Sequence, residues 1–235
     1  MRLVWGIGVV LGLACAQPSP TPQQTFEQTE ARALLALSQL RDQRAEVGNA
    51  IKALEAEVGN LPTLIERMNR QLQGVRGDFA RVRQGVSSPL RCLKRADIAY
   101  AINGGLAHAV TGNLAFSLRG DVGLALDAVQ SVAEQLEAAR RELDARLDQL
   151  HQQVNRLRLA VLTYPGGSER YSRLLAAAVE ATSKAQAQIR LVNQKQADLL
   201  AASQNHRRVA EQIYLQGRQT LTQAKGWLEG LACTS

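Results

Sequence analysis

Apolar residues recur at alternating spacings of four and three along the first third of the chain, apart from Arg44 in one slot. The positions are Ala33, Leu37, Leu40, Val47, Ile51, Leu54, Val58, Leu61, Ile65, Met68, Leu72, Val75, Phe79, Val82 and Val86. This spacing is typical of a long amphipathic helix. The stripe keeps its phase through Pro62, which a chain reversal would not preserve, so we expect one kinked helix over residues 25–86. At 1.5 Å per residue it would be about 90 Å long.

Similar stripes return over residues 122–161 and 171–228. Ser87, Ser88 and Pro89 offer an N-cap and a first-turn proline for a new helix, and Pro165-Gly166-Gly167 ends it. Three long helices joined by two short turns predict an all-α fold, an elongated antiparallel three-helix (up-down-up) coiled-coil-like bundle over residues 25–235. Stripes alone do not say whether the helices pair within one chain or between chains.

The segment 98–118 is the least regular part of the chain, because Ala, Leu and Ile are interrupted by glycines and polar residues. We expect broken or bent helix here. In architecture it resembles the hydrophobic head of helical pore-forming toxins, a resemblance of about twenty residues without a shared motif, which implies insertion into a bilayer. Asn103, His108, Thr111 and Asn113 would make that insertion costly. Close helix packing over Gly and Ala is the simpler interpretation.

The N-terminal residues have the layout of a secretory signal peptide, which we place at residues 1–16. Arg2 precedes an apolar run that ends at Ala14-Cys15-Ala16, and residues 17–24 are rich in Pro, Gln and Thr, as expected of an extended tether before an N-cap at Thr25. Cleavage after Ala16 would remove Cys15. Alternatively, Leu13-Ala14-Cys15 resembles the end of a lipobox, which implies a lipidated Cys15. Either outcome predicts an exported protein of the periplasm or cell envelope. An uncleaved membrane anchor is the third alternative, although it would need about 18 apolar residues and this run is nearer a dozen.

Two further cysteines meet in the predicted topology. Cys92 begins the second helix and Cys233 ends the third, so an up-down-up bundle brings both to the same end of the rod. In an exported protein such a pair is expected to be oxidised. The bond would close a loop of about 140 residues and stabilise the fold by about 5 kcal/mol on chain-entropy grounds. Two free thiols are the alternative.

The net charge of +7 is concentrated near that end. Residues 66–95 carry eight Lys and Arg against Glu66 and Asp78, and the topology places five of the cations around the cysteines. These five are Arg81, Arg83, Arg91, Lys94 and Arg95. A cationic tip can contact an anionic envelope polymer or a membrane surface, although a solvated basic face is the simpler interpretation. Only Phe79 lies among these charges, so the stacking platforms that bind nucleic acid strands are missing.

The sequence contains no GxSxG, Walker, HExxH, CxxC or dinucleotide-binding motif. We therefore expect no catalytic residue, cofactor, metal site or small-molecule substrate. His206 falls on an inner stripe and is interpreted as a core residue with satisfied hydrogen bonds. The alternating charges of residues 134–148 predict a solvated face with ion pairs between residues four apart.

These patterns favour an exported, non-enzymatic helical-bundle protein with a structural, spacer or protein-interaction role. Its helical stripes would bind a protein partner or a second copy of the chain. The alternatives are a membrane-active protein that uses residues 98–118, and a periplasmic chaperone or polyanion binder that uses residues 67–95.

Overall fold

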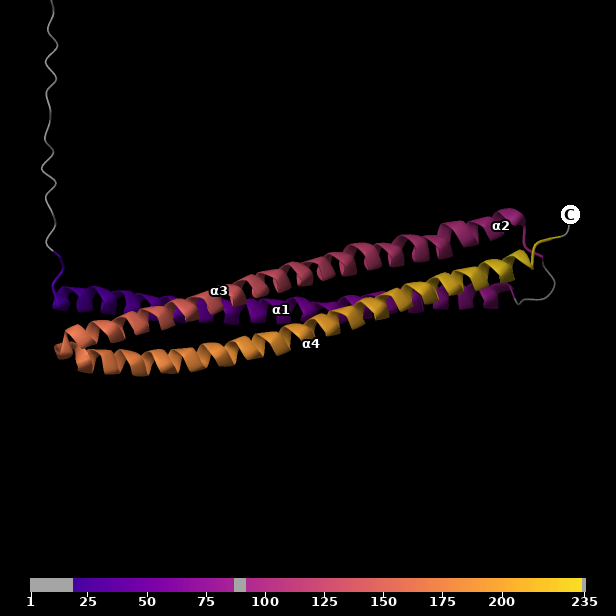
Figure 1. Cartoon of the computed structure of the whole chain (residues 1–235). Coiled ribbons are helices and arrows are strands. Elements are labelled where there is room, and N and C mark those ends of the chain that lie inside the picture. Colours follow the sequence, from indigo (N-terminus) through magenta and orange to yellow (C-terminus); the bar gives the residue numbers. More distant parts are fainter. Residues whose placement is uncertain (1–18, 87–91, 234–235) are drawn as a thin grey trace, which may run out of the picture.

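The computed structural model describes residues 19–86 and 92–233, and it forms a rod of three long helices (Figure 1). Helix α1 spans Pro22–Val86, α3 spans Gly123–Thr163 and α4 spans Ser168–Glu229. A short helix, α2 (Arg95–Tyr100), leads through three π-helical segments into α3, so residues 95–163 are one continuous helical run. The segments are η1 (Ala101–Leu106), η2 (His108–Leu114) and η3 (Ser117–Val122). The predicted all-α, up-down-up bundle is confirmed.

Hydrogen bonds between side chains fix the direction of the first and last helices relative to each other. Arg44 Nε donates to Gln188 Oε1 at 3.2 Å, and Arg76 Nη2 donates to Gln216 Oε1 at 3.0 Å. Both bonds join residues about 140 apart, which places α1 and α4 parallel and in register.

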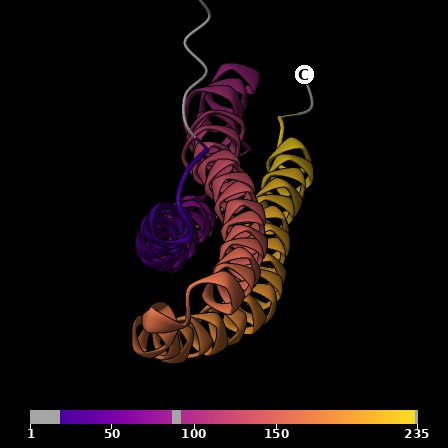
Figure 2. The ribbon, with the colours of Figure 1, turned by 60° about the vertical axis from the view of Figure 1, so that its left-hand side comes forward.

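The middle helix runs in the opposite direction to both neighbours. Gln43 on α1 donates to the carbonyl of Ala139 at 3.2 Å, and Gln196 on α4 donates to the carbonyl of Ala133 at 3.2 Å. Helices α1 and α3 share more contacts than α3 and α4 do. The three helices wind about one another along the rod (Figure 2).

Helix α1 begins three residues earlier than the sequence predicts. The Thr21 hydroxyl accepts a bond from the Gln24 amide at 3.2 Å, and the Thr21 amide donates to Gln24 Oε1 at 2.9 Å. This is a capping box, and Pro22 takes the first helical position, where no amide hydrogen is needed. The predicted cap at Thr25, and a tether reaching residue 24, are therefore wrong.

The predicted continuity of α1 through Pro62 is confirmed. Leu61 beside it is fully buried, so the apolar stripe crosses the proline without losing its place in the core. The predicted turn at residues 87–89 lies outside the described residues, as do the signal peptide and Cys15.

An aromatic cluster closes the rod at the turn between α3 and α4, which is the short 3-10 helix η4 (Pro165–Gly167). Phe26 is fully buried there, 5.6 Å from the Tyr164 ring centroid, and the Arg170 guanidinium lies over its face at 5.2 Å. A Cβ at Gly167 would lie 2.5 Å from the Phe26 ring. Only glycine therefore lets the turn approach the ring this closely.

The core divides along the rod, and we name two halves accordingly. The turn half comprises residues 19–65 and 123–206, and the cysteine half comprises residues 66–86, 92–122 and 207–233. One large buried cluster fills the turn half. The cysteine half holds a smaller cluster around Met68, Leu72 and Leu114, and another at the tip around Ile98 and Leu228.

Candidate interaction surface

A disulfide closes the end of the rod opposite the turn. Cys92 and Cys233 are bonded, with their Cα atoms 4.7 Å apart, which confirms that the fold brings the predicted pair to disulfide distance. Backbone bonds hold the segments beside the two cysteines together, because the Leu93 amide donates to Leu231 O at 2.9 Å and the Cys233 amide donates to Leu93 O at 3.1 Å. The second and third helices are thus tied by a covalent bond and a short backbone bridge.

The tip beneath the disulfide is packed with apolar side chains. Leu228 is fully buried against Ile98 and Ile102, and the Trp227 ring meets Phe79 edge-on at 6.0 Å. Both ends of the rod therefore carry an aromatic contact, although aromatic residues make up only 4% of the chain.

Two of the predicted basic residues, Arg81 and Arg95, line different hollows of the cysteine end. Arg81 forms an ion pair with Asp78 and lines a hollow beside Tyr100 and Gly104. Arg95 lines a different hollow, where its neighbours include Lys225 and Glu229, which pair at 3.9 Å. Lys94 is exposed, Arg83 has an interaction of its own, and Arg91 lies outside the described residues.

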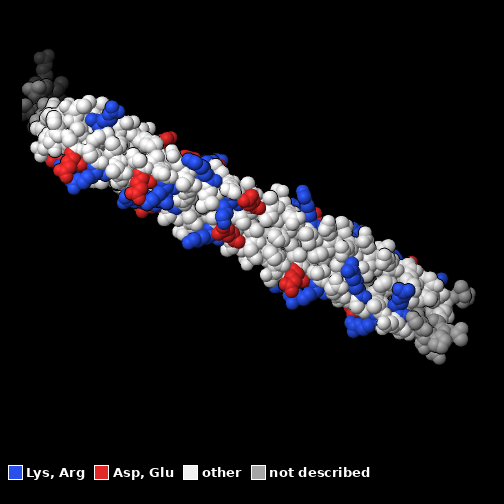
Figure 3. Space-filling view, turned by 90° about the horizontal axis from the view of Figure 1, so that it is seen from below, with Lys and Arg blue, Asp and Glu red and all other residues white. Residues whose placement is uncertain are grey.

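Charge nevertheless distinguishes the two halves. Residues 66–86, 92–122 and 207–233 carry twelve Lys and Arg against six Asp and Glu, whereas residues 19–65 and 123–206 carry fourteen against fifteen. On the face drawn in Figure 3, positive and negative groups alternate toward the turn end and positive groups predominate toward the cysteine end. The net charge of the protein is therefore a property of the cysteine half.

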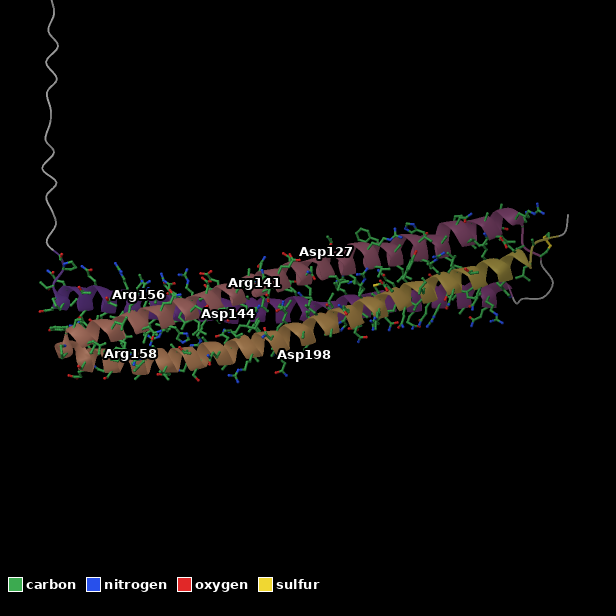
Figure 4. All side chains as sticks on the ribbon, in the orientation of Figure 1. Asp127, Arg141, Asp144, Arg156, Arg158 and Asp198 are labelled. Atoms are coloured by element: carbon green, nitrogen blue, oxygen red, sulfur yellow. A yellow bond between two sulfur atoms is a disulfide. The ribbon has the colours of Figure 1, made fainter. Side chains whose placement is uncertain are left out.

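Ion pairs on α3 balance the charges of the turn half. The Arg140 guanidinium bonds to Glu137 at 2.7 Å and to Asp144 at 3.1 Å, and Arg146 pairs with Glu142 at 2.8 Å. The predicted pairs between residues four apart are confirmed, and the Arg140–Glu137 pair joins residues three apart. Mainly because of the hydrogen bond from Arg140, the pKa of Glu137 falls to about 2. Other charged groups point outward along the helices, such as those labelled on α3 and α4 in Figure 4.

The run from residue 98 repeats every eight residues, with an aliphatic stripe on one face and alternating rings and glycines on the other. This repeat was not among the sequence predictions. Aliphatic residues recur every fourth position, and all are buried or half-buried against α1 and α4. They are Ile98, Ile102, Leu106, Val110, Leu114, Leu118, Val122 and Leu126. On an α-helix of 3.6 residues per turn, a spacing of four would drift by about 40° at each step. The wider π turns keep the stripe on one face. The helical run continues through the whole segment, so the break that the sequence predicted is absent between residues 95 and 163.

The opposite face of this run alternates rings and glycines. Tyr100 is 81% exposed, Phe116 is 69% exposed, and His108 between them is also exposed. Each is followed four residues later by a glycine, Gly104, Gly112 or Gly120, whose added Cβ would lie 3.2 to 3.5 Å from the preceding ring. Leu124, which is 69% exposed, continues the line. We call Tyr100, His108, Phe116, Leu124 and the three glycines the ring–glycine face.

His206 differs from its prediction as a satisfied core residue. It is half-buried at a hollow that also includes Pro62 and Gln212, and its Nδ1 has no hydrogen-bond partner among the described residues. Within those same residues no group of three His, Cys, Asp or Glu side chains is arranged to hold a metal ion. Over 19–86 and 92–233 no helix is both long and apolar enough to cross a membrane.

No family model, curated protein or solved structure matches this chain. The functional argument therefore rests on the rod, its disulfide-closed end and the ring–glycine face.

Proposed function

We propose that the protein is an exported, non-enzymatic rod of the bacterial cell envelope with a structural, spacer or protein-interaction role. The observation that carries the proposal is the architecture itself. A single helix of 65 residues spans the whole rod, which gives a length of about 100 Å. A molecule of this shape holds its two ends apart and offers long helical faces to other proteins.

The two ends are chemically different, as a spacer requires. The described chain begins at the turn end, beside η4, and finishes at the cysteine end (Figure 1). A signal peptide or a lipid on Cys15 would therefore precede the turn end. The cysteine end, with its disulfide and its excess of positive charge, would be held about 100 Å from that point.

An intact mass of the protein purified from its native envelope tests this proposal. A chain beginning at Gln17 that gains two hydrogens on reduction supports a periplasmic rod closed by Cys92 and Cys233. A diacyl or triacyl adduct on Cys15 supports a membrane-tethered lipoprotein instead. A full-length chain recovered from the cytoplasm with all three thiols free would contradict export and the role that depends on it.

A membrane-active role is the second candidate, and the exposed rings of Tyr100 and Phe116 favour it. Aromatic side chains flanked by cations such as Arg95 and Arg119 suit a membrane interface. The aliphatic residues of segment 98–118 are packed in the core, so insertion into a membrane would require the bundle to open. Dye leakage from vesicles of anionic lipid, lost in Tyr100→Ala and Phe116→Ala variants, would support this candidate. Intact vesicles would contradict it.

A periplasmic chaperone or polyanion binder is the third candidate, supported by the positive charge of the cysteine half. Retention on an anionic polymer that falls steeply with salt would support it. A Lys94→Ser, Arg95→Ser variant should then elute earlier, whereas an Arg156→Ser, Arg158→Ser variant of the turn half should not. Equal retention of both variants would contradict a role for the tip.

A further inference from the structure

We propose that the ring–glycine face binds a second copy of the chain as an antiparallel two-fold dimer centred on Val110. This inference rests on the proposed interaction role and specifies its partner. The face lies opposite the buried aliphatic stripe of the helical run, which is the uppermost part of the rod in Figure 1, and at Tyr100 and Gly104 it borders a hollow shared with Arg81 of α1. It exposes large apolar side chains in a straight line, which a monomer has no structural reason to keep.

The spacing along this face is self-complementary. In an antiparallel pair centred on residue 110, Tyr100 lies opposite Gly120 of the second copy, His108 opposite Gly112, and Phe116 opposite Gly104. No Cβ stands opposite any ring, but each glycine is covered by the ring four residues before it in its own chain. The two helices would therefore meet through their rings and not directly over the glycines. The rings of Tyr100 and of Phe116 in the second copy would lie one turn apart, near enough for ring contact.

The π turns make a contact of this length possible. A four-residue line on a regular α-helix would wind around the axis within a few steps, and two straight helices would then share only one or two of its positions. In this run the wide turns keep the ring–glycine face straight from residue 100 to residue 124. The same feature that keeps the inner stripe in the core thus aligns the outer face for a partner.

Charge favours the antiparallel arrangement over a parallel one. Near the two ends of the ring–glycine face lie two exposed residues of opposite charge, Arg95, at a hollow shared with α4, and Asp127. An antiparallel pair centred on Val110 brings Arg95 of each copy beside Asp127 of the other, which gives two symmetric ion pairs. A parallel, in-register pair would place Arg95 beside Arg95. Asp127 points outward from α3 in Figure 4.

The symmetry closes the assembly at two copies, because both use the same surface. Only residues 95–127 overlap, so each turn half extends beyond the cysteine end of the other copy. The dimer would be about 150 Å long, with the two turn ends, and hence residue 19 of each copy, at opposite tips.

Sedimentation of the purified protein over a concentration series measures the dimer constant and its determinants. A Tyr100→Ala, Phe116→Ala variant should dimerise on the order of ten- to a hundredfold more weakly, because two symmetric ring contacts are lost. Leu159→Ala, which removes a residue 64% exposed in the turn half, is the matched control and should not change the constant. Arg95→Asp and Asp127→Arg should each weaken the dimer, and the double variant should restore it. A monomer at every concentration would overturn the inference but leave the proposed rod function intact.

Interchain disulfides test the register directly. With the centre at Val110, the two copies of Thr111 lie about 3 Å apart along the axis, whereas the two copies of Asn103 lie about 20 Å apart. Thr111→Cys should therefore cross-link two chains on mild oxidation and Asn103→Cys should not. Cross-linking of both variants would indicate a parallel pair and overturn the inference, as would cross-linking of neither. Monomeric protein that binds anionic vesicles through Tyr100 and Phe116 would assign the face to lipid and also overturn it.

Discussion

The two halves of the rod use the same three helices in different ways. In the turn half, heptad spacing, regular α-helix, one large core and balanced ion pairs all agree with one another. In the cysteine half the spacing on one helix changes to four, the helix widens into π turns, the core is smaller, and positive charge is in excess. A disulfide is present only in this half of the described chain.

The difference indicates that the turn half is a scaffold and that the cysteine half carries the surface chemistry. Wide helical turns and exposed rings contribute less to a monomer than a regular heptad core does, and π turns occur frequently at functional sites. The disulfide at the cysteine end offsets this smaller contribution to stability, because it restricts the unfolded chain. The predictions below test whether the two halves differ in this way.

Removal of the disulfide should have the largest effect. We expect reduction, or a Cys92→Ser, Cys233→Ser variant, to lower the free energy of unfolding by up to about 5 kcal/mol, since a loop of about 140 residues is released. Urea unfolding with and without reductant measures the change. An unfolding midpoint that does not respond to reductant would show that the cysteine half is stable without its bond.

Two glycines, one in each half, should respond differently to alanine. At Gly167 a Cβ would lie 2.5 Å from the buried Phe26 ring, which has no room to move, so Gly167→Ala should cost about 2 to 3 kcal/mol. At Gly217 the contact is 2.8 Å to a terminal methyl of Leu114, which is also buried but stands at the end of a flexible side chain and gives way at lower cost than a ring. Because alanine also favours the helix by about 1 kcal/mol, Gly217→Ala should be nearly neutral. Thermal unfolding of both variants gives the comparison, and equal losses would contradict it.

The ion pairs of the turn half should make its stability depend on pH in the acidic range. The folded pKa of Glu137 is about 2, below its ordinary value of 4.5, so its contribution is present above pH 4.5 and is lost as the pH falls through 2. Glu137→Gln should therefore cost about 1 kcal/mol at pH 7 and nothing near pH 2. Asp148→Asn is the control, because Asp148 forms no ion pair among the described residues. A cost for Glu137→Gln that does not change with pH would exclude this cause.

Loss of an exposed ring should have the smallest effect on stability. Tyr100→Ala is expected to change the free energy of unfolding of the monomer by less than about 0.5 kcal/mol, because 81% of the side chain is exposed. Unfolding at a concentration too low for association measures it. A loss of 2 kcal/mol or more would mean that the ring supports the fold and would leave the ring–glycine face without a separate role.

Much of the fold could be predicted from the sequence because it depends on periodicity. A heptad stripe that keeps its phase through Pro62 implies one helix, and Pro165-Gly166-Gly167 implies a reversal. From that topology the meeting of Cys92 and Cys233 follows without further information. The first residue of α1 could not be predicted in this way, because Thr21-x-x-Gln and Thr25-x-x-Gln are equally good capping boxes.

The surface was harder to predict than the core. A constant spacing of four differs from the alternating fours and threes of a heptad stripe, so residues 98–124 look irregular until the π turns are known. The eight-residue repeat was nevertheless visible in the sequence, as a ring or Leu at every eighth position from Tyr100 and a glycine midway between them. The neighbours of the basic residues, such as Glu229 of α4 at the hollow of Arg95, come from distant parts of the chain that spacing does not reveal.

Hydrogen exchange of the oxidised protein, measured at several protein concentrations, tests the central claim that the cysteine half carries the surface that binds a second copy of the chain. We predict slow exchange at residues 129–160 at every concentration, and protection at residues 95–127 that rises as the protein becomes more concentrated. Exchange that is equally slow in both segments and independent of concentration would contradict the claim.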